Sequence, residues 1–421
     1  MSAADSGNAT PPLAADDAER RGQLSARVAA TVLASRESWT RRMFELGTQL
    51  RASQPLPVFD LSLGNPSLEP PKVWREAVLA ELENEPEGRH RYMTNAGFPE
   101  VRAFVAAREG ARYGLEFTVE HVTMTVGAAG ALNVLAQAML DPGDEVVAPA
   151  PYFSEYEQYC ATVGARLVPA ATGRDFSLDA GAIANAIGPR TRWVLLDSPN
   201  NPTGAIYGDD ELDALAAVLN RANRDRTRPI VVVEDAPYRD LVYDGGAVPS
   251  MLTRYPHVVF ATSHSKDLGL AGERIGYLLI SPHMFGRASL QRAAAYCTRI
   301  LGFVNAPALM QRTLPRVLSH PAGRVDVSIY ARNARRMASA LVEIGFTLPE
   351  PRAGFFLFPR LPERLRDAHG GDIALTERLV AERTLVVPGT AFGTPGYLRL
   401  SMAVDDPTVD GAIAAFARAC G

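Results

Sequence analysis

The chain has 421 residues, of which 47% are apolar and 21% charged, as is usual for globular proteins of two or three domains. Its net charge of −4 provides no basic field for nucleic acid and no polybasic patch for a membrane surface. Every apolar run is shorter than the roughly 18 residues that a bilayer-spanning helix needs.

The N-terminal part is predicted to be a leader followed by a helix. Residues 1–22 are small and polar, lack the pattern of a signal peptide, and are expected to be disordered. Helical spacing of apolar residues over 26–52 predicts a helix. Gly64 and three prolines then interrupt the pattern, and a second helix is expected with Pro71 at or just before its first turn. We assign residues 23–64 to a segment that packs with a smaller domain.

The middle of the chain, residues 65–304, alternates apolar β-branched runs with helix-like stretches. This alternation predicts an α/β domain of three layers, with a mostly parallel seven-stranded sheet covered on both faces. The last two runs are joined by a short loop that shows no helix pattern, so they are either antiparallel neighbours or not adjacent. The seven runs begin near residues 122, 144, 166, 191, 229, 257 and 274.

From about Asn305 the pattern changes to a long helical segment followed by short strands and a final helix. We therefore expect a smaller α+β domain over 305–421. A single large α/β domain with extensions remains the alternative.

Three cysteines, Cys160, Cys297 and Cys420, lie far apart and without the spacing of a metal site. Such spacing indicates a reducing compartment and no disulfide. The sequence is therefore most simply that of a cytoplasmic protein.

Ligands of open α/β sheets bind beyond the carboxyl ends of the strands, so the residues that follow each apolar run are candidates for a site. Ala128 and Ala129 follow the first run and open a helix, where backbone N–H groups suit a phosphate; a tight turn without ligand is the alternative. Tyr152, Phe153 and Tyr156 follow the next run and could stack on a planar ring or pack in the core.

Two further strand ends carry an amide and a carboxylate. Asn201 lies in the turn sequence NNPTG, where its amide faces a ligand oxygen or merely supports a turn that could contain a cis proline. Asp235 leaves a very apolar strand, where a carboxylate is costly unless it meets a cation or hydrogen-bond donors. It is a candidate partner for a buried positive group, although a helix cap or a salt bridge explains it equally well.

The stretch ATSHSKDLGLAGERIGY places Lys266 at another strand end. A lysine in a ligand crevice can lose its proton and form a Schiff base. Arg274 could bind a phosphate in bidentate fashion through two guanidinium N–H groups. The alternative is an ion pair between Lys266 and Asp267. Taken together, the strand ends provide a phosphate cradle, a stacking aromatic, a carboxylate for a ring cation, donors for a ring oxygen and an amine for an aldehyde. That set is what pyridoxal phosphate requires.

The sequence resembles a fold type I pyridoxal-phosphate enzyme of the class I/II aminotransferase family, and most of all the bacterial aspartate-aminotransferase-like proteins. The matching motifs follow the family order from about residue 58 to the end of the chain. They are SLGNPSLEPP, RYMTNAGFPEVR, GAAGALN, PAPYFSEY, SPNNPTG, EDAPYRDLVYDG, SHSKDLGLAGERIGY, RILGFVNAPALMQR and YLRLSMAV.

The resemblance implies roles at the ring of the cofactor. Lys266 would form the Schiff base and carry the proton between Cα and C4′. Asp235 would pair with the pyridinium nitrogen, Tyr238 and Asn201 would bond the ring O3′, and Phe153 would stack on the ring. The phosphate would be held by the Ala128 and Ala129 amides, Ser263, Ser265 and Arg274.

The resemblance also implies a homodimer with shared sites, because Tyr92 would reach the phosphate in the neighbouring subunit. Arg399 would bind the α-carboxylate of an amino acid or keto acid, with Gly64 and Asn201 beside it. No metal, nucleic acid or membrane enters this expectation.

Three positions depart from the pattern of related motifs: Ala129, Ala236 after the ring-pairing acid, and His264 two residues before the lysine. Arg299 lies near the place where dicarboxylate-specific relatives carry a distal arginine, but its register is open. The leading expectation is an aminotransferase. The alternatives are elimination, replacement or carbon–carbon bond formation at Cβ or Cγ of an amino acid such as S-adenosylmethionine, and a non-catalytic regulator that would need an added DNA-binding domain.

Overall fold

The computed structural model describes residues 22–25, 28, 39–53, 55–84, 87–368 and 371–421. The predicted leader lies outside these residues except for Gly22, and so does most of the predicted first helix before Trp39. Within the described part of the chain, none of the helices combines the length and the apolar character that a membrane crossing requires.

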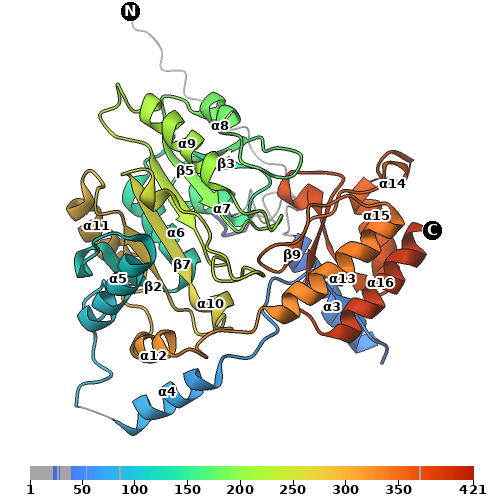
Figure 1. Cartoon of the computed structure of the whole chain (residues 1–421), viewed down its shortest axis with the longest axis horizontal. Coiled ribbons are helices and arrows are strands. Elements are labelled where there is room, and N and C mark those ends of the chain that lie inside the picture. Colours follow the sequence, from blue (N-terminus) through green and yellow to red (C-terminus); the bar gives the residue numbers. More distant parts are fainter. Residues whose placement is uncertain (1–21, 26–27, 29–38, 54, 85–86, 369–370) are drawn as a thin grey trace, which may run out of the picture.

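The larger part of the molecule is a seven-stranded sheet with helices on both faces (Figure 1). The strand order is β2-β8-β7-β6-β5-β3-β4, and β8 alone runs antiparallel to its neighbours β2 and β7. All seven predicted strands are therefore present. They are β2 (Val122–Thr125), β3 (Glu145–Pro149), β4 (Arg166–Ala170), β5 (Thr191–Asp197), β6 (Val231–Asp235), β7 (Val258–Ser263) and β8 (Gly276–Ile280).

Helices cover each face of this sheet, because successive side chains of a strand point to opposite sides. In β6, Val232 belongs to the core beneath α5, α8, α9 and α12, whereas Val231 and Val233 belong to the core beneath α6, α7 and α11. The helices of this part are α4 (Lys72–Glu83), α5 (Pro99–Tyr113), α6 (Gly127–Met139), α7 (Glu155–Thr162), α8 (Ala180–Ala186), α9 (Asp209–Ala222), α11 (Arg287–Ile300) and α12 (Ala308–Ser319), with short 3-10 turns η1 (Val119–His121) and η2 (Met251–Thr253).

The loop between β7 and β8 contains a one-turn helix, α10 (His264–Asp267), which the sequence pattern did not predict. The turn forms because the Ser263 hydroxyl accepts the backbone N–H of Ser265 at 3.2 Å. The expectation that β7 and β8 are antiparallel neighbours is confirmed, but the expectation of a loop without a helix is wrong.

A smaller α+β part follows and appears at the right of Figure 1. Its strands form an antiparallel sheet in the order β11-β12-β9, and β10 pairs in parallel with β1 (Phe59–Asp60) from the N-terminal segment. The elements are α13 (Ser328–Ile344), β9 (Phe356–Leu357), α14 (Glu363–Ala368), α15 (Gly371–Ala381), β10 (Thr384–Leu385), β11 (Val387–Pro388), η3 (Gly389–Phe392), β12 (Leu398–Ser401) and α16 (Asp406–Cys420).

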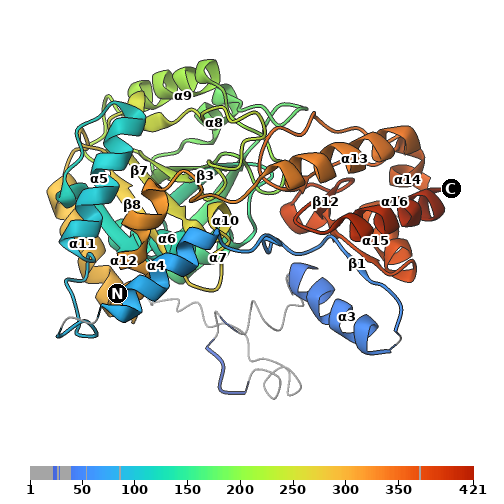
Figure 2. The ribbon, with the colours of Figure 1, turned by 60° about the horizontal axis from the view of Figure 1, so that its bottom comes forward.

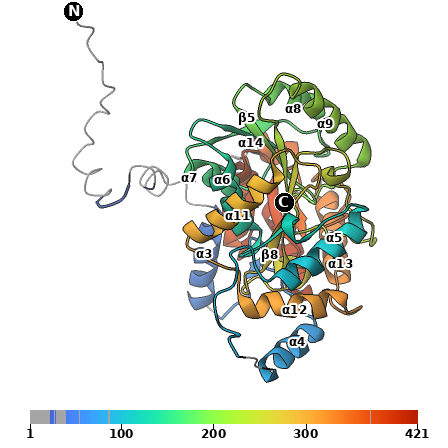
Figure 3. The same cartoon turned by 90° about the vertical axis from the view of Figure 1, so that its left-hand side faces the viewer.

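The N-terminal segment lies against this smaller part. Helix α3 (Trp39–Ser53) contacts β11, and Leu61 is buried in the core of the smaller part. Figure 2 shows α3 on the side of the smaller part. Helix α12 instead packs beside α4 (Figure 3), and its Met310, Leu314 and Val317 join the core of the large sheet. The predicted boundary at residue 305 stays a prediction, and α12, which follows it, contacts the helices and the core of the large sheet.

Candidate active site

A cavity of about 370 Å³ opens beyond the carboxyl ends of β5, β6 and β7, where the two parts of the molecule meet. It is lined by all of the predicted cofactor and substrate residues except Tyr92. Those residues are Gly64, Ala128, Ala129, Phe153, Asn201, Asp235, Tyr238, Ser263, Ser265, Lys266, Arg274 and Arg399.

One end of the cavity is built to receive an anion. Gly127 begins α6 with a φ of +76°, and a Cβ there would lie 2.9 Å from Arg274 Nη2 and 3.3 Å from Ser263 Oγ. The hydroxyl oxygens of Ser263 and Ser265 lie 2.6 Å apart, and Arg274 Nη1 lies 3.5 Å from Ser265 Oγ. A helix N-terminus, two hydroxyls and a guanidinium thus converge on one small space, which suits a phosphate.

Another part of the cavity lining is a buried carboxylate. Asp235 ends β6, and its Oδ2 accepts a hydrogen bond of 2.7 Å from the Tyr156 hydroxyl. Its Oδ1 has no partner among the described residues. Burial raises the pKa of Asp235 to about 6, against the opposing effect of the Tyr156 hydrogen bond. This oxygen is therefore available to a donor that enters the cavity, such as a ring N–H.

Lys266, on α10, lines the same cavity. Its Nζ donates to the Gly64 carbonyl oxygen at 2.5 Å and lies 5.4 Å from the centre of the Phe355 ring. Burial, and then the charges of Arg399 and Arg274, lower the pKa of Lys266 to about 8. A substantial fraction of the amine is therefore neutral near pH 8, as a nucleophile requires.

Arg399, on β12, is held in place by the surrounding backbone and rings. Its Nη2 donates to Ser62 O at 2.8 Å, its Nη1 donates to Asn201 Oδ1 at 3.3 Å, and it lies 4.7 Å from the ring centre of Phe356. Burial lowers its pKa to about 10, so the guanidinium stays charged at neutral pH. Its Nε has no partner within the described part of the chain and remains available to a carboxylate.

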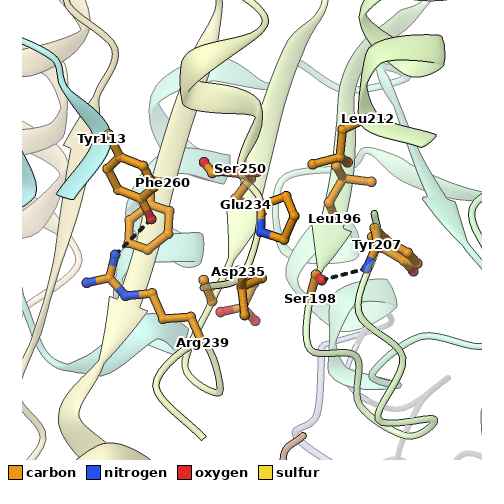
Figure 4. Close-up of a pocket in the computed structure, with 13 residues that line it drawn as sticks. Tyr113, Leu196, Ser198, Tyr207, Leu212, Glu234, Asp235, Arg239, Ser250 and Phe260 are labelled. Carbon is orange, nitrogen blue, oxygen red and sulfur yellow. Dashed lines mark hydrogen bonds between the residues drawn. The ribbon is translucent and has the colours of Figure 1, made fainter. Parts of the chain in front are cut away.

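A second, much smaller cavity borders Asp235 on its other side (Figure 4). Its volume of about 20 Å³ holds roughly one water molecule, which is too little for a substrate. Arg239 lies beside it and donates to the Tyr113 hydroxyl at 3.0 Å, as Figure 4 shows. Ala236 lines this small cavity and not the large one, so this departure from related motifs faces away from the candidate site.

Three singled-out residues lie outside the large cavity. Tyr92 is 88% exposed, and Arg299 is exposed with its guanidinium 5.6 Å from the Tyr296 ring. His264 is buried, and its Nδ1 lies 2.9 Å from Asp267 Oδ2. Lys266 Nζ donates to the Gly64 carbonyl oxygen and forms no ion pair with Asp267 among the described residues, so the alternative of a Lys266–Asp267 ion pair is wrong.

Sequence reasoning left several lining residues without a role, notably Glu155, Tyr159 and Asp197. The pattern that singled out Asp235, an acid at the end of a long apolar run, is also present at Asp197. Glu155 and Tyr159 carried none, since only the orientation of α7 brings them to the cavity.

The residues present fit pyridoxal phosphate. The space that a Cβ at Gly127 would fill could hold the phosphate, the unpartnered Asp235 oxygen could accept a ring N–H, and the Lys266 amine lines the same cavity and could bond an aldehyde. Fold and site together define a pyridoxal-phosphate enzyme of fold type I.

Comparison with known proteins identifies the family. The family described as aminotransferase class I and II matches residues 57–416. The chain is 30% identical to the aspartate/prephenate aminotransferase of Thermus thermophilus over 371 residues, which cover 86% of this chain and 90% of that protein. The probable aspartate/prephenate aminotransferase of Aquifex aeolicus is 29% identical over 83% of this chain and 87% of its own.

Comparison with solved structures supports the same family assignment. An aminotransferase from Eubacterium rectale superposes with a TM-score of 0.87 at 31% identity, covering 94% of this chain and 98% of that one. The Thermus thermophilus aspartate aminotransferase with maleate gives a TM-score of 0.82 at 28% identity, with 94% and 99% covered. The chain belongs to the class I and II aminotransferases and is a pyridoxal-phosphate-dependent aminotransferase. The alternative reactions at Cβ or Cγ are not favoured.

Proposed function

We propose that this aminotransferase moves an amino group between an α-amino acid and a 2-keto acid in the large cavity, with Lys266 as its catalytic residue. The observation that carries the proposal is the buried Lys266 amine, whose pKa is about 8, in one cavity with an anion-binding end and the Asp235 carboxylate. Pyridoxal phosphate, when bound, supplies an aldehyde that captures the amine and a ring that withdraws electrons from the bonds of Cα.

The chain's own residues then orient the substrate and move its proton. Arg399 binds the α-carboxylate through its free Nε and the neighbouring Nη groups, a fork that matches a carboxylate. This contact would hold Cα near Lys266, whose neutral amine would accept the proton from Cα and return it at the carbon of the former aldehyde. Ser263, Ser265 and Arg274 anchor the phosphate so that the distance between Lys266 and the reacting carbon stays short.

Asp235, Tyr238, Asn201 and Phe153 complete the binding of the ring. Asp235 accepts the ring N–H, Tyr238 and Asn201 donate to the ring oxygen, and Phe153 covers one face. All four line the cavity, which supports these roles. Asp235 has its greatest effect on the transferred proton, because a charged ring nitrogen makes the Cα proton more acidic.

We further propose a homodimer in which Tyr92 reaches the phosphate of the neighbouring site. The support is its 88% exposure and its absence from the cavity of its own chain, as far as the described residues define that cavity. A cytoplasmic location also stays a prediction; Cys160, Cys297 and Cys420 are buried and unpaired, which fits a reducing compartment.

The test is a half-reaction with single amino acids, followed by the absorbance change that accompanies conversion of the cofactor to its amine form. The panel includes L-aspartate, L-asparagine, L-glutamate and L-lysine. Arg399→Lys keeps the charge but loses the fork, and should raise KM about 10- to 100-fold with a smaller change in kcat. Failure of every amino acid to produce the amine form would refute transamination at this site.

A further inference from the structure

Two buried acids stand side by side below the ring-binding end of the cavity. Asp197 ends β5 and Asp235 ends β6, and the two are paired in the register of these parallel strands. Leu195 and Val233, two residues earlier in each strand, are likewise paired and belong to the core beneath α6 and α7. Because side chains alternate along a strand, both acids point to that same face.

This location tolerates one negative charge better than two. Asp197 is 4% exposed and Asp235 is 6% exposed, and neither forms a salt bridge with any described residue. The groups whose charge or hydrogen bonding couples to Asp197 are Asp235 and the hydroxyls of Tyr156, Tyr207 and Tyr238. Two adjacent carboxylates without a cation cannot both ionise at low cost, so one keeps its proton.

The hydrogen bonds indicate which acid keeps the proton. The single hydroxyl proton of Tyr156 is donated to Asp235 Oδ2, which stabilises the charged form of Asp235. Asp197 Oδ2 accepts the backbone N–H of Asn201 at 2.8 Å, and its Oδ1 has no partner among the described residues. Burial, and then the charge of Asp235, raise the pKa of Asp197 well above its usual value, against the backbone hydrogen bond from Asn201.

We propose that Asp197 is a positioning residue that stays protonated beside Asp235, so that this end of the site presents a single negative charge to the ring nitrogen of pyridoxal phosphate. Through its second oxygen Asp197 also fixes the turn that carries Asn201. Asp197 thereby connects Asn201, the proposed donor to the ring oxygen, with Asp235, the proposed acceptor of the ring N–H. This inference rests on the proposed function for its effect on the cofactor, but the protonation of Asp197 is a property of the protein alone.

The matched pair of variants is Asp197→Asn and Asp197→Ala. The amide reproduces a protonated acid and keeps an acceptor for the Asn201 N–H, whereas alanine leaves that buried N–H unpaired. Binding of pyridoxal phosphate to the apoprotein is titrated by fluorescence. The expected dissociation constant stays within about threefold of wild type for Asp197→Asn and rises at least about tenfold for Asp197→Ala.

A spectroscopic readout reports the charge directly. With ¹⁵N-labelled pyridoxal phosphate, the ring-nitrogen chemical shift should indicate a protonated ring in both wild type and Asp197→Asn. Equal loss of affinity in the two variants, or loss of the protonated signal in Asp197→Asn, would mean that Asp197 contributes its charge and would overturn the proposal. Wild-type affinity in Asp197→Ala would overturn it as well.

The cofactor-free protein decides the question even if pyridoxal phosphate does not bind. When the pKa of an acid is higher in the folded than in the unfolded protein, the protonated acid stabilises the fold. This contribution is complete below the pKa of the unfolded protein, about 4, and is lost as the pH rises toward the pKa of the folded protein. The thermal midpoint of the wild-type apoprotein should therefore fall relative to that of Asp197→Asn as the pH rises above about 4. Parallel profiles for the two proteins would refute a protonated Asp197, whereas absence of any wild-type affinity for pyridoxal phosphate would refute the proposed function.

Discussion

Replacement of Gly127 by alanine tests the anion-binding end of the cavity. The added Cβ would lie 2.9 Å from Arg274 Nη2 and 3.3 Å from Ser263 Oγ, and 2.9 Å is closer than a Cβ tolerates. Arg274 is the flexible partner, so its guanidinium moves and the phosphate loses one charge-assisted hydrogen bond. Such a bond contributes about 1.5–3 kcal/mol, which corresponds to an increase of about 10- to 150-fold in the dissociation constant of pyridoxal phosphate.

The same substitution also strains the backbone, because φ at Gly127 is +76°. We expect it to cost about 1–2 kcal/mol of unfolding free energy. Gly114 provides the control, since its φ is +66° and a Cβ there would meet no described atom within 4 Å. Gly114→Ala should lose similar stability in urea denaturation but bind pyridoxal phosphate with wild-type affinity.

The assay is a fluorescence titration of each apoprotein with pyridoxal phosphate, beside a urea melt. Unchanged affinity in Gly127→Ala would refute the assignment of the phosphate to this end of the cavity. Equal loss of affinity in Gly114→Ala would show that backbone strain, and not the displaced guanidinium, is responsible.

Four further outcomes follow from the same geometry. Glu109, fully buried, accepts from Arg239 at 2.7 and 2.9 Å, so Glu109→Gln should lower the unfolding free energy by about 3–5 kcal/mol in a urea melt. Glu155 lines the cavity, so Glu155→Gln should raise kcat/KM for L-aspartate relative to L-asparagine by about tenfold; an unchanged ratio would remove Glu155 from the substrate side. The Lys266 pKa of about 8 predicts that the rate of cofactor incorporation into apoprotein rises about tenfold per pH unit below pH 8 and levels off above it, whereas a flat profile would contradict a neutral-amine requirement. Mixing Lys266→Ala subunits with Tyr92→Phe subunits of lowered activity should raise the activity by up to about one quarter of the wild-type value if sites are shared, and should give no increase if they are not.

The strands could be predicted because strands buried on both faces show as continuous apolar runs, as in β6. The site followed from one rule, that ligands bind beyond the carboxyl ends of such strands, and Asp235, Lys266 and Asn201 all lie there. These residues carry local signals: a charge or an amide placed where an apolar run stops.

The remaining features depend on packing that no local pattern contains. His264 could face the site or the core, and the one-turn helix that rotates it toward Asp267 depends on a hydroxyl cap. Tyr156 looked like an ordinary core aromatic, because its bond to Asp235 spans 79 residues of chain. Helix α12 has an amphipathic pattern that does not say which core it joins, so its packing against the large sheet could not be predicted from the sequence.

The most direct test of the account uses the small number of lysines in this chain. Lys72 and Lys266 are its only two, and Lys72 is exposed at the start of α4 and is not among the residues that line the cavity. Borohydride reduction of the protein with bound pyridoxal phosphate, followed by proteolysis and mass spectrometry, should give one modified peptide, which contains Lys266. The adduct should persist in Lys72→Ala and be absent from Lys266→Ala that is shown to fold by circular dichroism. An unchanged adduct in Lys266→Ala would contradict the central claim that this lysine bonds the cofactor.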